Sequence, residues 1–406
     1  MLTQSTGSEP EAREARTWWL YGAAVLSGMV VIAYLAVWAR RYGLDLRVYR
    51  DSATAWLDGH DPYSSTFTPS RLAFTYPPFA LGVLSVLTVA SFAVTQWLLW
   101  GASVAAATAA VVIVLRDRGF TGGLGLWCGS FAWACVATVA LEPVRSGMNY
   151  GQIEFVLLFM VVADVLVVPA PVRGVLIGIA GAVKLTPLAF VVVFLVDRDW
   201  RSGVRATVSF VLCTGAAWLF RPELSRVFWN DDVRHPARVG TVAYAGNQSW
   251  FAVLHRPPFA GAAGGWAWIA LSLVTVLVGT FVAWRSVHTG QRSLAVVAIA
   301  LVGLLVSPIS WTHHWVWVLL IPPVLIGPRR HRMEPVTRAM LWGIVGITMA
   351  APYWWIGSGP AADALEAVLP LWTFATLVLW AGADYTCWRR STSPSGTRAA
   401  DPAVIP

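Results

Sequence analysis

The stretch Gly174-Val-Leu-Ile-Gly-Ile-Ala-Gly-Ala-Val-Lys184-Leu-Thr-Pro-Leu-Ala-Phe-Val-Val-Val-Phe194 is apolar over the length of a membrane-spanning helix, apart from one cation. Lys184 is the only lysine among the 29 lysines and arginines of the chain. A charge at such a depth costs between about 2.5 and 17 kcal/mol, which makes it a functional residue by default. The alternative is a lysine that snorkels to the membrane surface, although the nearer end of the run is roughly 15 Å of helix away.

The composition is that of a membrane protein. The chain has 406 residues, of which 57% are hydrophobic and 12% are charged, and its mean hydropathy is +0.62. Soluble domains carry about a quarter charged residues, so a water-soluble globule is excluded. The net charge is +8, but the arginines are spread among loops and termini. They therefore indicate anionic lipids or lipid phosphates as partners rather than nucleic acid.

Further apolar runs predict an all-α integral membrane protein with about twelve transmembrane helices. We expect one polytopic domain over residues 1–388 and a disordered cytoplasmic tail over residues 389–406. No separate soluble domain is predicted. The runs lie at residues 20–38, 76–90, 96–115, 124–141, 153–168, 174–194, 206–220, 266–284, 294–306, 315–326, 339–353 and 368–385.

Basic loops predict the orientation, because short cytoplasmic loops are enriched in lysine and arginine. The arginines near residues 198–205, 285–292 and 329–338 fall on one side with the tail, which places both termini in the cytoplasm. The polar stretches 40–75, 221–265 and 308–314 then lie on the outer face. Two conflicts remain. The segment 149–154 falls inside unless a short or re-entrant segment precedes it, and four arginines fall outside, namely Arg40, Arg41, Arg116 and Arg118.

The first outer loop predicts an amphipathic helix that lies on the membrane between Asp45 and Gly59, which serves as its C-terminal stop. Asp45 begins this helix. Its carboxylate has two possible roles: a helix N-cap, or a general base that takes a proton from a hydroxyl group. The loop continues into Phe74-Thr-Tyr76-Pro77-Pro78-Phe79, whose prolines and aromatic rings favour a structural role at the membrane interface.

Three other polar clusters interrupt apolar sequence. Asn149-Tyr-Gly151-Gln152-Ile-Glu154 carries two amides and an acid that either bind sugar hydroxyls or cap a helix. Asn247-Gln248-Ser249-Trp250 matches a glycosylation sequon, a pattern that is frequent by chance. Ser307-Pro-Ile-Ser-Trp311-Thr-His313-His314-Trp315 could hold a phosphate with its histidines and a sugar with its indoles, or form an aromatic belt. A metal site is not expected, because adjacent histidines diverge and no third ligand is suitably spaced. No nucleotide-binding motif occurs, and Asp197-Arg198-Asp199 is interpreted as a solvated turn.

Taken in order, these motifs resemble glycosyltransferase family 87, within the GT-C class of membrane glycosyltransferases. The resemblance runs from about Asp45 to Trp317, and each of its motifs is short. The family includes actinobacterial polyprenyl-phosphate-mannose-dependent alpha-1,2-mannosyltransferases that act on phosphatidylinositol mannosides. The motifs are Asp45-Leu-Arg-Val-Tyr49, Phe74-Thr-Tyr-Pro-Pro78, Gly151-Gln152, Lys184-Leu-Thr-Pro187, Asn247-Gln-Ser249 and Ser307-Pro-Ile-Ser-Trp-Thr-His-His-Trp315.

The resemblance implies a multi-pass GT-C fold in a bacterial plasma membrane, with its active site on the periplasmic face. It implies an inverting transfer of mannose from a lipid-phosphate donor to a phosphatidylinositol mannoside or related lipoglycan. Membrane lipids are the other partners. No cofactor beyond the lipid-linked donor is implied, no metal ligand is assigned, and a metal requirement stays open.

The resemblance also implies roles for individual residues. Asp45 would be the base and His313 a second catalytic residue. Cations would stabilise the departing lipid phosphate, and Lys184, His314 and Arg47 are the candidates. The candidates for binding the sugar or the acceptor are Tyr49, Tyr76, Gln152, Glu154, Asn247, Gln248 and Trp311.

Two other classes of protein fit parts of the sequence. In a secondary transporter, Lys184 would bind the substrate or a coupling ion, but such proteins usually show internal repeats and paired broken helices. A non-catalytic lipid-binding protein is the third possibility. The concentration of polar motifs on the predicted outer face favours the enzyme.

Overall fold

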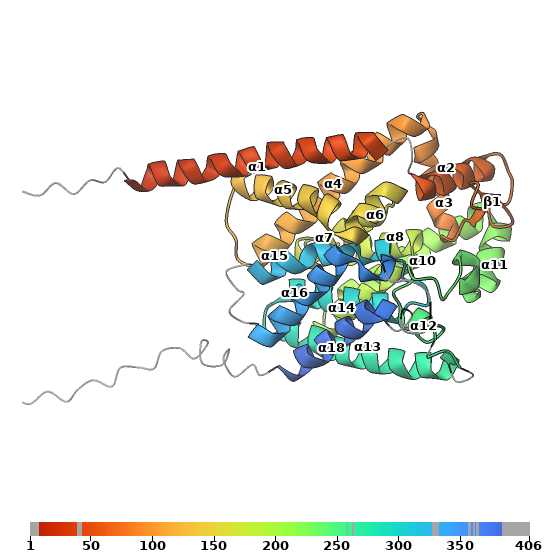
Figure 1. The fold of residues 1–406 in the computed structure, drawn as a ribbon. Helices are drawn as coiled ribbons and strands as arrows, with labels where there is room; N and C mark the ends of the chain where they lie inside the picture. Colours follow the sequence, from red (N-terminus) through yellow and green to blue (C-terminus); the bar gives the residue numbers. More distant parts are fainter. Residues whose placement is uncertain are drawn as a thin grey trace, which may run out of the picture.

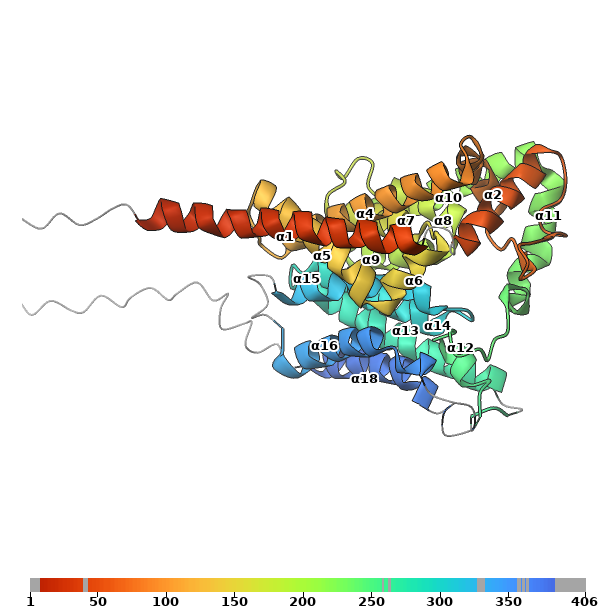
Figure 2. The ribbon, with the colours of Figure 1, turned by 45° about the horizontal axis from the view of Figure 1, so that its top comes forward.

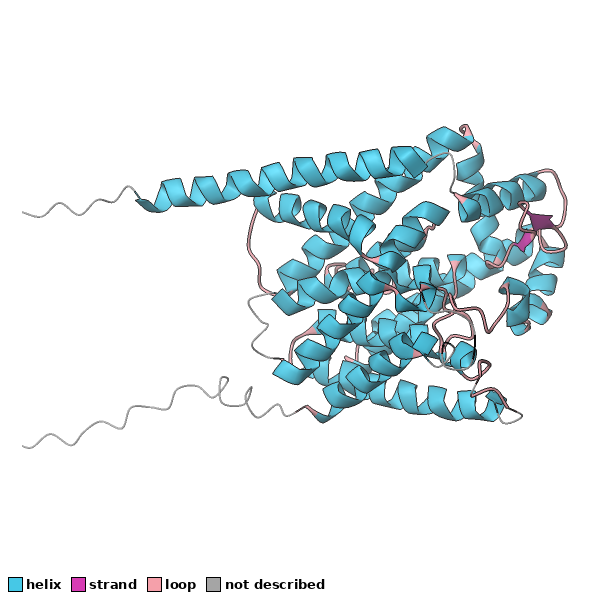
Figure 3. Ribbon diagram, viewed as in Figure 1, coloured by secondary structure: helices cyan, strands magenta, loops and turns pink. Residues whose placement is uncertain are grey.

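The computed structural model describes residues 8–38, 43–257, 259–261, 264–326, 333–355 and 365–383, together with residues 359 and 362. Within these residues the chain is almost entirely helical (Figure 3). Four helices are long and apolar enough to cross a membrane: α1 (Ser8–Trp38), α4 (Phe92–Asp117), α10 (Trp200–Phe220) and α13 (Gly264–His288). A fifth candidate is the bent pair α5 (Leu124–Ala140) and α6 (Glu142–Tyr150). The described helices therefore support a membrane protein, and they do not confirm a count of twelve spans.

Shorter helices pack between these long ones. They are α7 (Glu154–Leu166), α8 (Val175–Val183), η2 (Thr186–Phe190), α9 (Val191–Val196), α14 (Arg292–Val306), η5 (Thr312–Leu320), α15 (Ile321–Ile326), α16 (Pro335–Ala350) and α18 (Val368–Gly382). Almost every side chain of α14 is buried, so this helix lies within the core.

The remaining elements gather at one end of the molecule, which we call the loop end. Figures 1 and 2 both place α2 and α11 there, remote from the start of α1. The elements are α2 (Leu44–Leu57), the hairpin of β1 (Thr66–Phe67) and β2 (Leu72–Ala73), α3 (Pro78–Leu84), η1 (Ser85–Thr88), α11 (Pro222–Asn230), η3 (Asp232–Arg234), η4 (Pro236–Val239), α12 (Trp250–Val253) and η7 (Pro352–Trp354).

The opposite end collects arginine-bearing turns, and it corrects one sequence-based expectation. Arg118 donates to Gln291 at 2.8 Å, and the Asp117 carboxylate accepts from the backbone of Ser293 at 3.3 Å. The turn that carries Arg116 and Arg118 therefore lies on the same face as the turn before α14, not on the opposite one. Arg40, Arg41 and the cluster 329–332 lie outside the described residues, as does the tail 389–406.

The physical reason is the segment 76–90, which does not form a span. It folds as α3 followed by η1, and the guanidinium of Arg50 on α2 donates to the carbonyls of Leu87 and Ala90. Both ends of the segment thus lie beside α2, at the loop end. Because this segment does not cross the membrane, the end of α4 lies on the arginine-bearing face.

The apolar run 174–194 does not form a single span either. The helix α8 ends at Val183, Lys184 has extended backbone angles, and Pro187 lies in the first turn of the 3-10 helix η2, which begins at Thr186. Proline lacks an N–H and disfavours a helical residue before it, so the helix cannot continue. The two ends of the run are joined by an Arg173–Asp199 ion pair of 3.4 Å. The run is therefore a helical hairpin, and Lys184 lies near its tip.

A second bend brings the segment 149–154 to the loop end. The helices α5 and α6 meet at 86° around Leu141. The end of α6 then contacts the start of α2, where the Gly43 N–H donates to the Asn149 carbonyl at 2.7 Å. Gly151 has a φ of 73° and lies so close to Leu46 that a Cβ would be 2.8 Å from that side chain. This bend is the kind of short segment that would place residues 149–154 on the same side as the other polar clusters.

The amphipathic helix predicted at residues 45–59 is confirmed as α2. It buries one face through Leu46, Tyr49 and Ala53. It ends before Gly59, whose φ of 84° is the left-handed conformation that glycine adopts at helix ends. The structure thus places α2 directly beside the polar segment that follows α6.

Candidate active site

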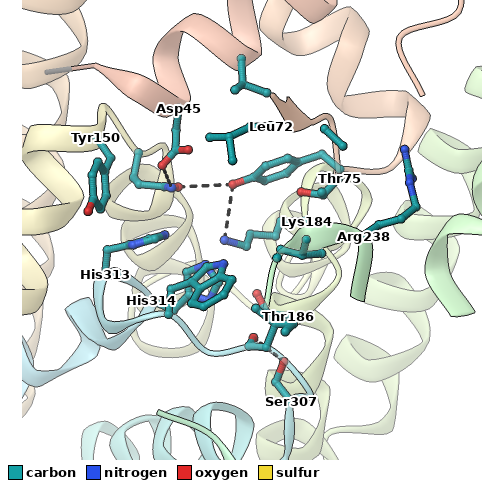
Figure 4. A pocket seen from close by; sticks show the side chains of 18 of the residues that line it. Asp45, Leu72, Thr75, Tyr150, Lys184, Thr186, Arg238, Ser307, His313 and His314 are labelled. Atoms are coloured by element: carbon teal, nitrogen blue, oxygen red, sulfur yellow. Dashed lines mark hydrogen bonds between the residues drawn. The ribbon is translucent and has the colours of Figure 1, made fainter. Parts of the chain in front are cut away.

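A cavity of about 540 Å³ lies at the loop end, a size typical of small-molecule sites. It is enclosed by α2, the junction of α6 and α7, the tip of the α8–α9 hairpin and the corner before η5 (Figure 4). Eight predicted site residues line it: Asp45, Tyr49, Tyr76, Gln152, Lys184, Trp311, His313 and His314. Segments far apart in sequence therefore converge on one cavity.

Lys184 forms an ion pair with Glu154, the first residue of α7. Both side chains are largely buried, with 15% and 8% of their surface exposed. The His314 Nε2 atom lies 3.4 Å from the same Glu154 oxygen. Glu154 lines a smaller neighbouring cavity of about 50 Å³ beneath Lys184. The lysine is thus neither a snorkelling side chain nor an isolated charge, because a buried carboxylate balances it.

A chain of hydrogen bonds connects Lys184 with Asp45 (Figure 4). The Lys184 Nζ atom lies 3.5 Å from the hydroxyl of Tyr76, which lies 2.7 Å from the hydroxyl of Tyr49. Tyr49 donates to the Gln152 Oε1 atom at 2.8 Å, and the Gln152 amide nitrogen donates to the Asp45 Oδ2 atom. The amide of Gln152 is therefore oriented by its tyrosine donor, and it presents an N–H to the carboxylate.

Asp45 does not cap its own helix with its side chain. The N-cap of α2 is Gly43, and no side-chain cap bond is present there. Burial raises the pKa of Asp45 to about 7, against the opposing effects of the Gln152 hydrogen bond and the Lys184 charge. A carboxylate with a pKa near neutrality suits general-base catalysis, because it is a stronger proton acceptor and is still substantially ionised.

The two histidines enter the cavity from the start of η5. The ring of His313 packs edge-on against Tyr150 at 5.1 Å and against His314 at 4.7 Å. The preceding residue, Thr312, donates to the buried carboxylate of Glu142 at 3.0 Å. Glu142 also accepts from Tyr353 at 2.8 Å. The sequence reasoning missed Glu142, which fixes the backbone from which the histidines project.

Three predicted site residues do not reach the cavity. Arg47 is exposed on the other side of α2, with its guanidinium 4.5 Å from the ring centre of Phe92. Asn247 is fully buried, and its amide bonds to the backbone of Val242, Pro308 and Ser310. Gln248 is buried as well and donates to the Ala245 carbonyl at 2.6 Å. The structure therefore does not bring these three residues to the cavity, where they were expected.

The cavity also has residues that the sequence did not single out. Its outer part includes the ring of Tyr244, the ring of Trp354 and an ion pair between Arg238 and Asp232 at 2.5 Å. An aromatic residue in a polar loop is a weak signal for a binding site, because a role in an aromatic belt at the membrane interface fits equally well. Among the described residues, no three histidine, cysteine, aspartate or glutamate side chains gather as metal ligands.

Comparison with known proteins identifies relatives with a shared chemistry. The model of glycosyltransferase family 87 matches residues 74–308. The chain is 33% identical over 332 residues to the polyprenol-phosphate-mannose-dependent alpha-(1-2)-phosphatidylinositol mannoside mannosyltransferase of Mycobacterium tuberculosis, covering 76% of this chain and 75% of that protein. It is 31% identical over 322 residues to the corresponding phosphatidylinositol pentamannoside mannosyltransferase of Mycolicibacterium smegmatis, covering 77% of this chain and 76% of the relative. No solved structure matches significantly.

Proposed function

The chain belongs to glycosyltransferase family 87, and from this premise we propose that it transfers mannose from polyprenyl-phosphate-mannose to a phosphatidylinositol mannoside. The product linkage is alpha-1,2. The observation that carries the proposal is the single cavity in which a base, Asp45, and a buried cation, Lys184, are held by one chain of hydrogen bonds. The names of the relatives supply the donor and the class of acceptor.

The reaction is one displacement at the anomeric carbon of the beta-linked donor mannose. The acceptor 2-hydroxyl oxygen forms the new bond while the bond to the phosphate oxygen breaks with its electron pair. The proton of the hydroxyl passes to the free oxygen of Asp45, and polyprenyl phosphate leaves. Attack from the face opposite the phosphate inverts the configuration and gives the alpha product.

The departing phosphate gains negative charge, which nearby cations stabilise most in the transition state. Lys184 is the candidate for this role, and His313 and His314 are the candidate hydrogen-bond donors beside it. The small cavity beneath Lys184 is lined by aliphatic and aromatic side chains, including Leu157, Ile299 and Leu304. This apolar lining suits the first carbons of a prenyl chain whose phosphate lies at Lys184.

We propose a multi-pass plasma-membrane protein with the cavity on the periplasmic face and the termini in the cytoplasm. The arginine-bearing turns at the end opposite the cavity support this orientation. Fewer than twelve of the apolar runs cross the membrane, because 76–90 returns to the loop end and 174–194 forms a hairpin. A cysteine-free variant with Ser64→Cys should react with an impermeant label from outside intact cells, and one with Arg201→Cys should not. Protection of residue 64 would overturn this orientation.

The activity is tested directly with purified protein, polyprenyl-phosphate-mannose and a panel of mannosylated lipids. We expect one added mannose on a phosphatidylinositol mannoside, seen by mass spectrometry, and an alpha-1,2 linkage by glycosidase digestion and NMR. Intact donor and unchanged acceptors throughout the panel would contradict the proposed function. Movement of the donor across proteoliposomes without product would instead support a transporter.

A further inference from the structure

The outer part of the cavity carries three aromatic rings that the transfer reaction itself does not use. Tyr244 contacts Trp311 with ring centroids 5.9 Å apart and Trp354 with centroids 5.8 Å apart. All three rings line the cavity, and the side chains of Tyr244 and Trp354 are 52% and 38% exposed. We call Tyr244, Trp311 and Trp354 the ring wall. Large rings at this exposure leave apolar faces available to a ligand.

The ring wall is held from within by a buried framework. Arg256 is 1% exposed and donates to the carbonyls of Ala243, Tyr244 and Asn247 at 3.0, 2.5 and 2.6 Å. The Asn247 amide adds a bond of 3.1 Å to the Pro308 carbonyl, which joins this loop to the segment that carries Trp311. The rings of Tyr244 and Trp311 therefore project from a fixed backbone, which lowers the entropy cost of binding.

One glycine explains how two of the rings approach each other. A Cβ at Gly246 would lie 2.8 Å from the Tyr244 ring and 3.0 Å from the Trp354 ring. Any other residue would have to displace one of them. The backbone at Gly246 thus packs directly against both rings, and the wall has a defined shape before a ligand arrives.

Polar groups beside the rings indicate what the wall binds. Arg238 and Asp232 line the same cavity as the rings; Arg238 pairs with Asp232 and also donates to the Tyr63 carbonyl at 2.6 Å, so a charged pair is held at the cavity wall. Aromatic faces next to a planar guanidinium and a carboxylate match a sugar, which has an apolar C–H face and a rim of hydroxyls. The smaller cavity beside Lys184, at about 50 Å³, is lined mainly by apolar side chains and is assigned to the donor's hydrocarbon.

We propose that the ring wall is a subsite for the acceptor glycan, which stacks a mannosyl unit of the acceptor on Trp354 and Tyr244. This inference rests on the proposed function and assigns the acceptor to the outer part of the cavity. The donor occupies the Lys184 side. The loop that contains Asn247 and Gln248 then contributes to the acceptor site indirectly, through the backbone that carries Tyr244.

The test is the steady-state kinetics of Trp354→Ala with a deacylated, water-soluble phosphatidylinositol mannoside as the acceptor. We expect the acceptor KM to rise about tenfold, the value of one aromatic contact. The donor KM and the slow hydrolysis of the donor by water should stay at wild-type values. Trp354→Phe should recover much of the loss. The matched control is Trp355→Ala, because this neighbouring indole is 79% exposed and does not line the cavity.

Tyr244→Ala is the second variant, in case Trp354→Ala folds poorly, and it should raise the acceptor KM in the same direction. An unchanged acceptor KM in both variants would overturn the subsite. So would a penalty seen only with the acylated acceptor, because the wall would then bind lipid rather than sugar. Failure of the wild type to use any mannosylated acceptor would count against the proposed function instead, so the two failures are distinguishable.

Discussion

Asp45 and Asp164 are two aspartates enclosed by the protein, and they differ in how many of their carboxylate oxygens accept hydrogen bonds. Asp164 is fully buried in α7, where its two oxygens accept from the backbone N–H groups of Gly174 and Ile177 at 2.7 and 2.8 Å. Both donors belong to the start of α8. Asp45 accepts from Gln152 alone among the described residues, and it lines the cavity.

The difference separates a carboxylate held on both oxygens from one that keeps an oxygen open to the cavity. Both Asp164 oxygens accept from backbone N–H groups, so this residue caps α8 and neither of its oxygens is free of a hydrogen bond. Asp45 has one oxygen held by an oriented amide and a second oxygen available to a hydroxyl group. Asp164 and Lys184 lie at opposite ends of one helix, because α8 begins at the Asp164 cap and ends at Lys184. The start of the hairpin therefore depends on Asp164, whereas under the proposed function the proton transfer depends on Asp45.

The largest expected effect is that of Asp45→Asn. The amide retains the shape of the side chain but cannot accept the proton, so we expect transfer to fall by about 10² to 10⁴-fold. The melting temperature should stay at or above the wild-type value, since a buried charge is removed. Turnover by mass spectrometry and thermal unfolding in detergent are the two measurements. Wild-type turnover in this variant would show that Asp45 is not the base.

The second effect concerns the cation at the hairpin tip. Lys184→Ala removes the proposed stabilisation of the leaving phosphate, and we expect a loss of about 10² to 10³-fold in kcat. Lys184→Arg should recover little, because the planar guanidinium does not replace a compact ammonium in this enclosed site. The control is Arg205→Ala, which removes a cation remote from the cavity. Equal activity of Lys184→Ala and the wild type would make the lysine a purely structural partner of Glu154.

The third effect is a shift in pH dependence. The base must be ionised, so kcat/KM should fall as the pH drops through about 7, the pKa of Asp45. Gln152→Leu removes a hydrogen bond that lowers this pKa, and we expect the falling limb to move up by about one pH unit. Tyr49→Phe leaves the Gln152 donor in place and should produce a smaller shift. An identical pH profile in Gln152→Leu and the wild type would show that Gln152 does not tune the pKa of the base.

The smallest effect on activity is expected at Asp164. Asp164→Ala leaves two backbone donors at the start of α8 without acceptors, which costs about 1 to 3 kcal/mol of stability. The melting temperature should therefore fall, while turnover per folded molecule stays within a few-fold of the wild type. A catalytic defect as large as that of Asp45→Asn, at an unchanged melting temperature, would remove the distinction between the two aspartates.

Parts of the site were predictable from the sequence because their signals are local. The helix α2 follows from its apolar periodicity and from the glycine that ends it. Lys184 stands out because a lone lysine in apolar sequence is costly wherever it lies. The family resemblance placed Asp45 and the two histidines together, and the structure brings all of them to one cavity.

Other parts could not be predicted, because they depend on contacts between distant segments. The run 174–194 has the length and composition of a span, and only the packing of its two ends shows a hairpin. The pairing of Glu154 with Lys184 could not be predicted, because Glu154 lies 30 residues before Lys184 and no periodicity links them. The placement of Asn247 was not predictable for a similar reason. An amide in a polar loop looks available to a sugar, whereas here the backbone of a second segment occupies it.

Under the proposed function, the proton of the acceptor passes to Asp45, which lines the cavity, and not to Asp164, which is buried in α7. The most direct test measures single-turnover mannose transfer in the wild type, Asp45→Asn and Asp164→Asn in parallel, with rates normalised to folded protein. We predict that Asp164→Asn transfers mannose at nearly the wild-type rate and that Asp45→Asn gives almost no product. Comparable rates in the two variants, or a slower rate in Asp164→Asn, would show that Asp45 is not the base.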